Sequence, residues 1–420
     1  MPYQRSLTIV APVREGAEDD VESLLGTMGN GVANGSVIDF GALEDVHFAR
    51  LIMAPADSDH SGGRLPASVI LLSDFDVTVD AHLEQLVEAA GPGIDQVFGR
   101  CEGYPEGAPT ARDRLDYLRR HVVQEAARYV NTSGRTVRQI RQESALRDAI
   151  EAALDDPGRS WHGRDPSDVR RAMRESVAQD PELAWALEPA ERPSLAARAR
   201  EKGHLVAVPI LTLPFVPILL LVAPFFALLL RIHEKRDAAP HAKPDEERVH
   251  MLAALEDHLV QNPFTAIGHI KPGRFRRWTL VVILFYLGYA TRHFFNRGNL
   301  AGVKTIHFAR WVFIDGRRRM FFASNYDGSL ESYMDDFIDK VAWGLNLVFS
   351  NGVGYPRTSW LVRGGARDEL AFKDYLRVHQ VPTRVWFSAY GRLTALNIQQ
   401  NERIRDGLRG GDDSKWVQSL

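Results

Sequence analysis

Apolar residues follow two different spacings along this chain. Short runs rich in β-branched residues, such as TIVAPV (8–13) and SVILLSDF (68–75), predict β-strands. The segment LESYMDDFIDKVAWGLNLVF (330–349) instead places apolar residues at helical spacing, namely Leu330, Met334, Phe337, Ile338, Val341 and Leu345. The same reasoning predicts helices over 17–29, 275–295 and 366–379, and strands over 47–54, 307–314, 318–326 and 383–390. Alternation of this kind predicts an α+β fold.

The pattern occurs twice. Blocks from the first 150 residues return in the same order near the C-terminus, 251 to 260 residues later. The matched blocks are TIVAPVREG (8–16) with TAIGHIKPG (265–273), VHFAR (46–50) with IHFAR (306–310), ILLSDFDVT (70–78) with FFASNYDGS (321–329), GYP (103–105) with GYP (354–356), DYLRRH (116–121) with DYLRVH (374–379), and QESALRD (142–148) with QNERIRD (400–406). Because the offset drifts by only a few residues, we interpret the chain as an internal duplication.

Each copy has the element order βαββαβ, which is the ferredoxin-like split βαβ unit. A four-stranded sheet of this type has one face covered by its own helices and one bare face. Pairing the two bare faces would bury both, so the sequence predicts a pseudo-dimeric α+β barrel. The predicted organisation is a first repeat over 1–150, a helical insertion over 151–260 and a second repeat over 261–420, with a linker at 155–168.

The second copy contains a predicted β-hairpin. In IDGR (314–317), Asp315 and Gly316 are typical of a two-residue type I′ turn. This turn would pair residues whose numbers sum to 631, so that His307 faces Ser324. Both faces of the hairpin carry apolar side chains, which indicates that both are covered.

One segment departs from the pattern of a soluble protein. HLVAVPILTLPFVPILLLVAPFFALLLRI (204–232) contains 26 uncharged residues from Leu205 to Leu230. As a helix these residues would extend roughly 39 Å, which exceeds the ~30 Å of a bilayer core. A second run, WTLVVILFYLGYA (278–290), has 13 residues, a length that favours a buried or interfacial helix.

A single crossing by 204–232 would place the two copies on opposite sides of the membrane, where they could not pair. The segment could bend at its prolines and return, the second run could cross back, or the segment could form a buried hairpin. Basic residues flank both ends, in ARAREK (197–202) and RIHEKR (231–236). This favours a re-entrant or monotopic anchor on the cytoplasmic side.

Composition, charge and the absence of known motifs exclude some classes of function. Charged residues make up 25% of the chain and the net charge is −3, so nucleic acid is not an expected partner. The single cysteine, Cys101, fits a reducing compartment, and the N-terminal stretch turns acidic too early for a signal peptide. Walker A, His-Glu-x-x-His, Cys-x-x-Cys and Gly-x-Ser-x-Gly motifs are absent, and no metal site is predicted.

Polar residues recur within the repeated strands. His47 and His307 could act as bases or ligands, although a structural hydrogen bond, such as that of His307 to Ser324, is the more ordinary explanation. Arg50 and Arg310 lie on an otherwise apolar face, so each needs an anion, which could be a structural carboxylate or the carboxylate, propionate or phosphate of a ligand. We favour the structural partner.

Further candidates lie at the ends of secondary-structure elements. Asn325 and Asp327 end a strand, where Asp327 or Ser329 could cap the next helix or open a polar site. His379 ends a helix, where a cation suits the helix dipole. Tyr390, in WFSAYG, could line a pocket, although an aromatic strand residue usually belongs to the core.

The duplicated βαββαβ pattern resembles the dimeric α+β barrel superfamily, which includes dye-decolourising peroxidases, chlorite dismutase-like proteins and small monooxygenases. Asp327-Gly328 matches the end of the peroxidase Gly-x-x-Asp-Gly motif, without its leading glycine. The resemblance implies haem as a cofactor, with Arg310 as the distal arginine and His379 as the proximal ligand. The segments HFARW, SNYDGS and GVGYP also resemble a bacterial family without an assigned function.

We therefore expect a membrane-associated protein that binds a hydrophobic or amphipathic small molecule in the second copy, where aromatic residues are more frequent. One hypothesis is a haem-linked, peroxidase-like oxidoreductase. Its candidate catalytic residues are Arg310, Asp327 and His307, and its candidate cofactor-binding residues are His379, Arg310, Asn325 and Tyr390. The alternative is a non-catalytic module that binds lipid or a partner protein. Cofactor-free oxygenase chemistry stays open, and the sequence predicts no oligomeric state.

Overall fold

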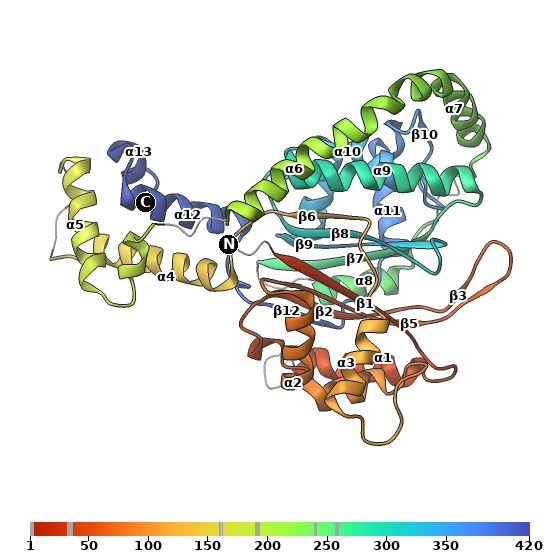
Figure 1. The fold of residues 1–420 in the computed structure, drawn as a ribbon, viewed down its shortest axis with the longest axis horizontal. Coiled ribbons are helices and arrows are strands. Elements are labelled where there is room, and N and C mark those ends of the chain that lie inside the picture. Colours follow the sequence, from red (N-terminus) through yellow and green to blue (C-terminus); the bar gives the residue numbers. More distant parts are fainter. Residues whose placement is uncertain are drawn as a thin grey trace.

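Two four-stranded antiparallel sheets lie face to face at the centre of the molecule (Figure 1). The computed structural model describes residues 4–31, 37–158, 161, 163–189, 194–238, 242–256 and 260–420. The first sheet has the order β1 (Arg5–Pro12), β5 (Ser68–Phe75), β2 (Val46–Ala54), β12 (Val385–Ser388). The second has the order β6 (Ala127–Val130), β8 (Ile306–Ile314), β9 (Arg319–Asp327), β7 (Gln261–His269).

Helices cover the outer face of each sheet, so the body has four layers (Figure 1). The first sheet packs against α1 (Glu18–Gly31), α2 (Val79–Phe98) and α3 (Ala111–Arg120). The second packs against α9 (Arg274–His293), α10 (Leu330–Phe349) and α11 (Glu369–His379). Between the sheets lies an apolar cluster that includes Ile52 and Ile70 from one sheet and Val312 and Phe321 from the other. The chain is therefore a mixed α/β protein with open antiparallel sheets, as the element order predicted in part.

The two halves of the chain exchange their last strands. Strand β12, from the second half, pairs with β2 of the first half, and β6, from the first half, pairs with β8 of the second. At the position expected for a fourth strand of each βαββαβ unit there is only a short bridge, Ile9 with Val122 and Ala266 with Gln380. Because of this exchange, each sheet combines strands from both halves of the chain.

The register of the β8–β9 hairpin differs from the predicted one. Paired residues sum to 633 rather than 631, as in Ala309 with Ser324 and Ile314 with Arg319. The connection spans four residues, Asp315–Arg318, in which Asp315, Gly316 and Arg317 have positive φ. A shift of two residues preserves the faces of the strands, because side chains alternate with a period of two.

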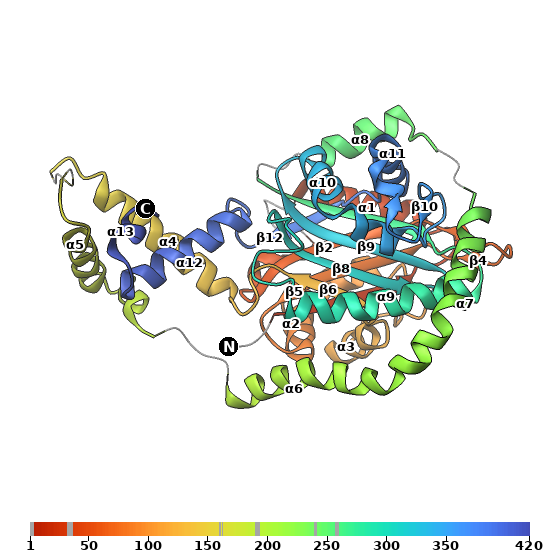
Figure 2. The same ribbon diagram turned by 90° about the horizontal axis from the view of Figure 1, so that it is seen from above.

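A helical arm extends from one end of the sheets (Figure 2). The exchanged strands lead into its two longest helices, α4 (Val137–Leu154) and α12 (Ala395–Arg409), which pack with α5 (Pro166–Gln179) and α13 (Asp413–Val417). Leu146, Met173, Leu408 and Trp416 are among the residues of its core. The predicted linker at 155–168 falls mainly between α4 and α5, and its residues 159, 160 and 162 lie outside the described residues.

The apolar segment forms a bent helical run that we call the apolar arch, residues 195–236. It consists of α6 (Leu195–Thr212), a 3-10 turn (Leu213–Phe215) and α7 (Val216–Arg236). The bend coincides with Pro214 and Pro217, each of which removes a backbone donor. In the view of Figure 1, α6 diverges from α9, and its bend into α7 stands off the body. Helix α8 (Glu246–Glu256) then precedes β7.

Short elements complete the described part of the chain. They are the pair β3 (Asp57–Ser58) and β4 (Arg64–Leu65), the pair β10 (Thr358–Ser359) and β11 (Arg363–Gly364), and 3-10 turns at Phe40–Ala42, Ala184–Leu187 and Gly365–Arg367.

Candidate functional site

Two buried arginines join the sheets across their shared face. Arg50, on β2, donates to the carbonyl oxygens of Phe264 (2.9 Å) and Ser324 (2.7 Å) in the opposite sheet. Arg310, on β8, makes the matching contacts to the carbonyl oxygens of Leu7 (2.8 Å) and Ser73 (3.2 Å). The acceptors are related by the same offsets as the repeated sequence blocks. These acceptors are neutral backbone carbonyls, whereas the sequence predicted an anionic partner for each arginine.

The two arginines differ in their remaining partner. Arg310 forms a buried ion pair with Asp74, whereas Arg50 donates to the neutral amide oxygen of Asn325 at the equivalent position. Burial and the neighbouring Arg310 lower the pKa of Arg50 to about 9. The Arg50 guanidinium is therefore still charged at neutral pH, without a carboxylate as its direct partner.

Each repeated histidine forms a pair with an aspartate. His307 Nε2 lies 2.6 Å from Asp327 Oδ1, and His47 Nε2 lies 2.8 Å from Asp76 Oδ1. Both histidines occupy a β-bulge, since the register of β2 shifts between Val46 and Phe48 and that of β8 between Ile306 and Phe308. A bulge redirects a side chain out of the normal alternation. The predicted contact of His307 with Ser324 is therefore wrong: Ser324 Oγ bonds to Tyr333 Oη instead (2.7 Å).

The two aspartates also accept from the first backbone N–H of α4 and α12 in the arm. Asp76 Oδ2 accepts from the backbone N–H of Val137 (2.7 Å), and Asp327 Oδ2 accepts from that of Ala395 (2.8 Å). A carboxylate is stabilised at a helix N-terminus by the helix dipole. The N-cap of α12 is Thr394, and Asp327 accepts from the first N–H of that helix. Ser329 is the N-cap of the following helix α10, which agrees with its predicted role.

Tyr390 completes one of the two pairs. Its hydroxyl lies 2.8 Å from His47 Nδ1, while the equivalent nitrogen of His307 has no partner among the described residues. Burial, with the nearby carboxylates Asp76 and Asp74, raises the pKa of Tyr390 well above its usual value. The phenol therefore stays protonated, so it cannot act as a phenolate nucleophile at neutral pH.

Little space remains inside this polar layer. A cavity of about 10 Å³ lies between the arginines, lined by Arg50, Asp74, Arg310, Asn325 and apolar neighbours. That volume accommodates about one water molecule, whereas small-molecule sites usually have 300–1,000 Å³. Five of the six predicted site residues, Arg310, Asp327, His307, Asn325 and Tyr390, do lie in this layer, but their contacts are those of a structural network.

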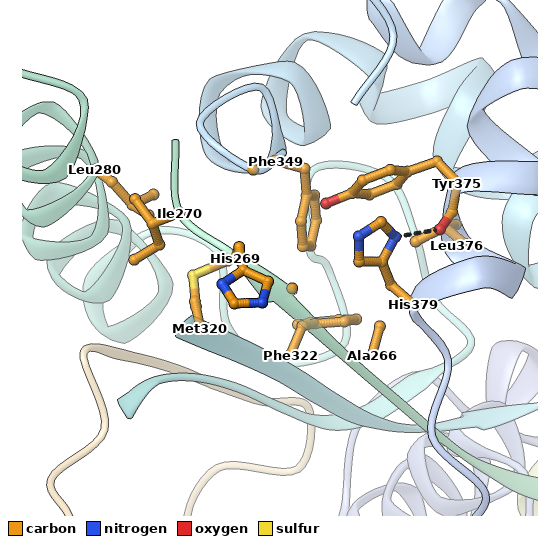
Figure 3. A pocket seen from close by; sticks show the side chains of 12 residues that line it. Ala266, His269, Ile270, Leu280, Met320, Phe322, Phe349, Tyr375, Leu376 and His379 are labelled. Atoms are coloured by element: carbon orange, nitrogen blue, oxygen red, sulfur yellow. Dashed lines mark hydrogen bonds between the residues drawn. The ribbon is translucent and has the colours of Figure 1, made fainter. Parts of the chain in front are cut away.

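His379 lies elsewhere, in a small pocket on the outer face of the second sheet (Figure 3). The pocket has a volume of about 20 Å³ and is lined by apolar residues together with Tyr375, His379 and His269. His379 Nδ1 donates to the Tyr375 carbonyl oxygen (2.8 Å), and burial lowers the pKa of His379. Burial therefore disfavours the charged form of this imidazole.

The positions of these residues do not fit a haem held between His379 and Arg310. Arg310 shares its face of the sheet with Val312 and Ala323, which point towards the other sheet. The pocket of His379 is lined by Ala266, Met320 and Phe322 on the opposite face. The sheet separates the two side chains and neither cavity exceeds about 20 Å³, so these residues do not form a haem site.

A different kind of site lies on the surface of the second half. The most apolar part of the arch has none of its residues buried, and Leu221 is 82% exposed. Next to the arch, the outer side of α9 exposes Trp278, Val282, Phe285 and Tyr286. Exposed apolar surfaces of this extent mark interaction sites with membranes or proteins. The 42 residues from Leu195 to Arg236 are long and apolar enough to cross a membrane.

Both ends of the arch are fixed to the same body. Near its start, Glu201 pairs with Arg292 of α9, and the Leu205 carbonyl accepts from the Tyr289 hydroxyl (2.7 Å). Near its end, the buried Glu234 accepts backbone N–H bonds from Trp360 (3.0 Å) and Leu361 (2.8 Å). Attachments at both ends keep the start and the end of the arch on one side of any boundary that its middle enters.

Comparisons with protein-family models, with curated proteins and with solved structures give no match for this chain.

Proposed function

We propose that this protein is a monotopic membrane-surface protein whose apolar arch and the outer side of α9 insert into one leaflet of a bilayer. The observation that carries the proposal is the exposed, uncharged middle of the arch, whose two ends are both attached to one folded body. A single crossing would require the two ends to lie on opposite sides. An in-plane or re-entrant arrangement satisfies both the apolar surface and the attachments.

Aromatic residues next to arginines support this orientation. Trp278 is 57% exposed beside the arch, and the Arg317 guanidinium lies 5.5 Å from its ring. Trp360 is also exposed, and Arg231 lies 5.1 Å from its ring. Tryptophan is enriched at the interface between lipid and water, and basic residues mark the cytoplasmic side. We therefore assign the body to the cytoplasmic face.

In this proposal the remainder of the chain is a rigid, non-catalytic carrier of the arch. We infer that it is a fused pseudo-dimer of two ferredoxin-like units, related to dimeric α+β barrels. The support is the recurrence of side-chain contacts at matched offsets: Gln4 and Gln261 donate to the carbonyl oxygens of Thr132 (2.7 Å) and Tyr390 (3.2 Å), respectively. The lack of a ligand-sized cavity at either place where the predicted residues lie favours a carrier over an oxidoreductase.

Vesicle flotation of the full chain tests this proposal. We expect the wild-type protein to float with phospholipid vesicles, and Leu220→Glu with Leu221→Glu to reduce its partitioning by at least about 10-fold, because two apolar side chains no longer enter the lipid. Leu370→Glu with Leu396→Glu is the matched control, since both leucines are exposed and belong to α11 and α12 rather than to the arch. A wild-type protein that stays with the aqueous fraction would refute the proposal.

A further inference from the structure

The end of the arch is surrounded by positive charge. Five basic residues gather where α7 ends, where α9 begins and at the β8–β9 turn, and we call them the basic border: Lys235, Arg236, Arg274, Arg277 and Arg317. Two contacts bring these segments together. The His233 ring stacks on Phe275 with centroids 4.8 Å apart, and Arg317 lies over the ring of Trp278. The basic border therefore lies next to the exposed apolar surface.

The basic border has no compensating carboxylates of its own. None of its five residues forms an ion pair with a described residue. The acidic groups nearby are already engaged: Asp237 pairs with Lys271 (2.8 Å) and Arg276, Asp315 pairs with Arg319 (2.6 Å), and Glu234 pairs with Arg231. The region thus carries a net positive charge that is available to an external anion.

The start of α9 adds unsatisfied donors. Arg276 is 1% exposed, and its Nε and Nη1 have no partner among the described residues. The first turn contains no acidic residue, and Gly273 at the N-cap provides no side-chain acceptor. Arginines at the positive end of a helix dipole are unfavourable unless an anion is present, and Asp237 pairs with Arg276 but not with Arg274 or Arg277.

Positive charge also lies at the other end of the arch, where Arg198, Arg200 and Lys202 are exposed. An apolar surface with basic residues at both ends matches a bilayer, in which the hydrocarbon lies beneath a layer of phosphates. We propose that the basic border binds the phosphate groups of anionic phospholipids, so that the protein selects negatively charged membranes. This inference rests on the proposed membrane function.

Binding to vesicles of phosphatidylcholine alone, and of phosphatidylcholine mixed with phosphatidylserine, tests the inference. We expect tighter binding to the anionic vesicles, weakened by added salt. Arg274→Gln with Arg277→Gln should weaken binding to anionic vesicles by about 5-fold for each charge removed and leave binding to neutral vesicles unchanged. Lys235→Gln with Arg236→Gln should act in the same way and provides a second variant if the first misfolds.

Arg120→Gln with Arg138→Gln is the matched control, because it removes the same charge from exposed positions on α3 and α4, which lie away from the arch (Figure 1). Equal binding of the wild type to neutral and anionic vesicles would overturn the inference and keep the proposed function. Binding to neither would overturn both. If the control variant weakened binding to anionic vesicles as much as the border variants do, the assignment of the binding site to the basic border would be wrong. Inorganic phosphate that binds without vesicles, and is lost in the border variants, would identify free phosphate as the ligand instead.

Discussion

The two halves of the chain place equivalent helices on their sheets, but the outer surfaces of these helices differ. Helix α1 contacts the exchanged strand β12, and α9 contacts the exchanged strand β6. Helix α1 begins with Glu18, Asp19 and Asp20, as expected for the positive end of a helix dipole, whereas α9 begins with Arg274 and exposes an apolar side. We interpret the shared inner contacts as a requirement of the fold, and the changed outer face of α9 as a requirement of the proposed membrane surface.

Differences inside the halves are fewer and more local. At equivalent positions the first half has Asp74, His82, Ala11 and Cys101, and the second has Asn325, Tyr333, Gly268 and Gly352. At each of these positions, the residue of one half can be replaced by the residue found at the equivalent position of the other half. Exchanging the residues at such positions shows which side chains both halves require and which are specific to one half.

Removal of the buried arginines should have the largest effect and should distinguish the halves. Arg310→Ala leaves the Asp74 carboxylate buried without its cation, so we expect a loss of about 3–5 kcal/mol in the free energy of unfolding. Arg50→Ala leaves a neutral amide and carbonyl oxygens, and we expect a smaller loss of about 1–3 kcal/mol. Urea unfolding in detergent, followed by tryptophan fluorescence, measures both.

The control for this comparison is the double variant Arg310→Ala with Asp74→Asn. It gives the first half the neutral residue of the second half, so it should recover part of the loss caused by Arg310→Ala. If Arg50→Ala were as harmful as Arg310→Ala, the difference between Asp74 and Asn325 would not determine how much each arginine stabilises the fold.

His82 should make the first half sensitive to acid. This histidine is 1% exposed, its ring nitrogens have no partner among the described residues, and burial lowers its pKa to about 3. The unfolded chain binds the proton more tightly, so stability falls as the pH drops below about 6.5, by about 2 kcal/mol between pH 7 and pH 5. Tyr333, at the equivalent position, does not titrate in this range.

His82→Tyr should remove that part of the pH dependence. In the second half the Tyr333 hydroxyl bonds to Ser324, whereas Ser73, the equivalent of Ser324, has a buried Oγ without a partner among the described residues. The new tyrosine can therefore satisfy Ser73, and we expect no loss of stability at pH 7. Unfolding free energies at pH 7 and pH 5 measure the effect. An unchanged slope in the variant would show that other groups cause the acid sensitivity.

The sequence allowed the strands, the helices and the repeated polar residues to be predicted because their signals are local or duplicated. The exchange of β6 and β12 was not predicted, since a four-residue edge strand carries no mark of its partner. The predicted register of β8 and β9 was wrong because Asp315–Arg318 forms a four-residue turn rather than a two-residue turn. The bulges at His47 and His307, which turn these residues towards their aspartates, depend on strand pairing. Alignment of Ala11 with Gly268 could have indicated the pocket of His379.

Replacement of Gly268 by the alanine of the first half should have the smallest effect on stability. A Cβ at Gly268 would lie 3.1 Å from His379 Cδ2 and 3.6 Å from Tyr375 Oη, so it would enter the pocket with little displacement. We expect Gly268→Ala to change the free energy of unfolding by less than about 1 kcal/mol, because reduced freedom of the unfolded chain offsets the close contact. Gly352→Ala should cost more, since its Cβ would lie 2.6 Å from Tyr375 Oη. Ala11→Gly in the first half is the matched reverse exchange and should destabilise by about 1 kcal/mol. A loss above about 2 kcal/mol in Gly268→Ala would mean that the space beside His379 is required by the second half rather than merely tolerated.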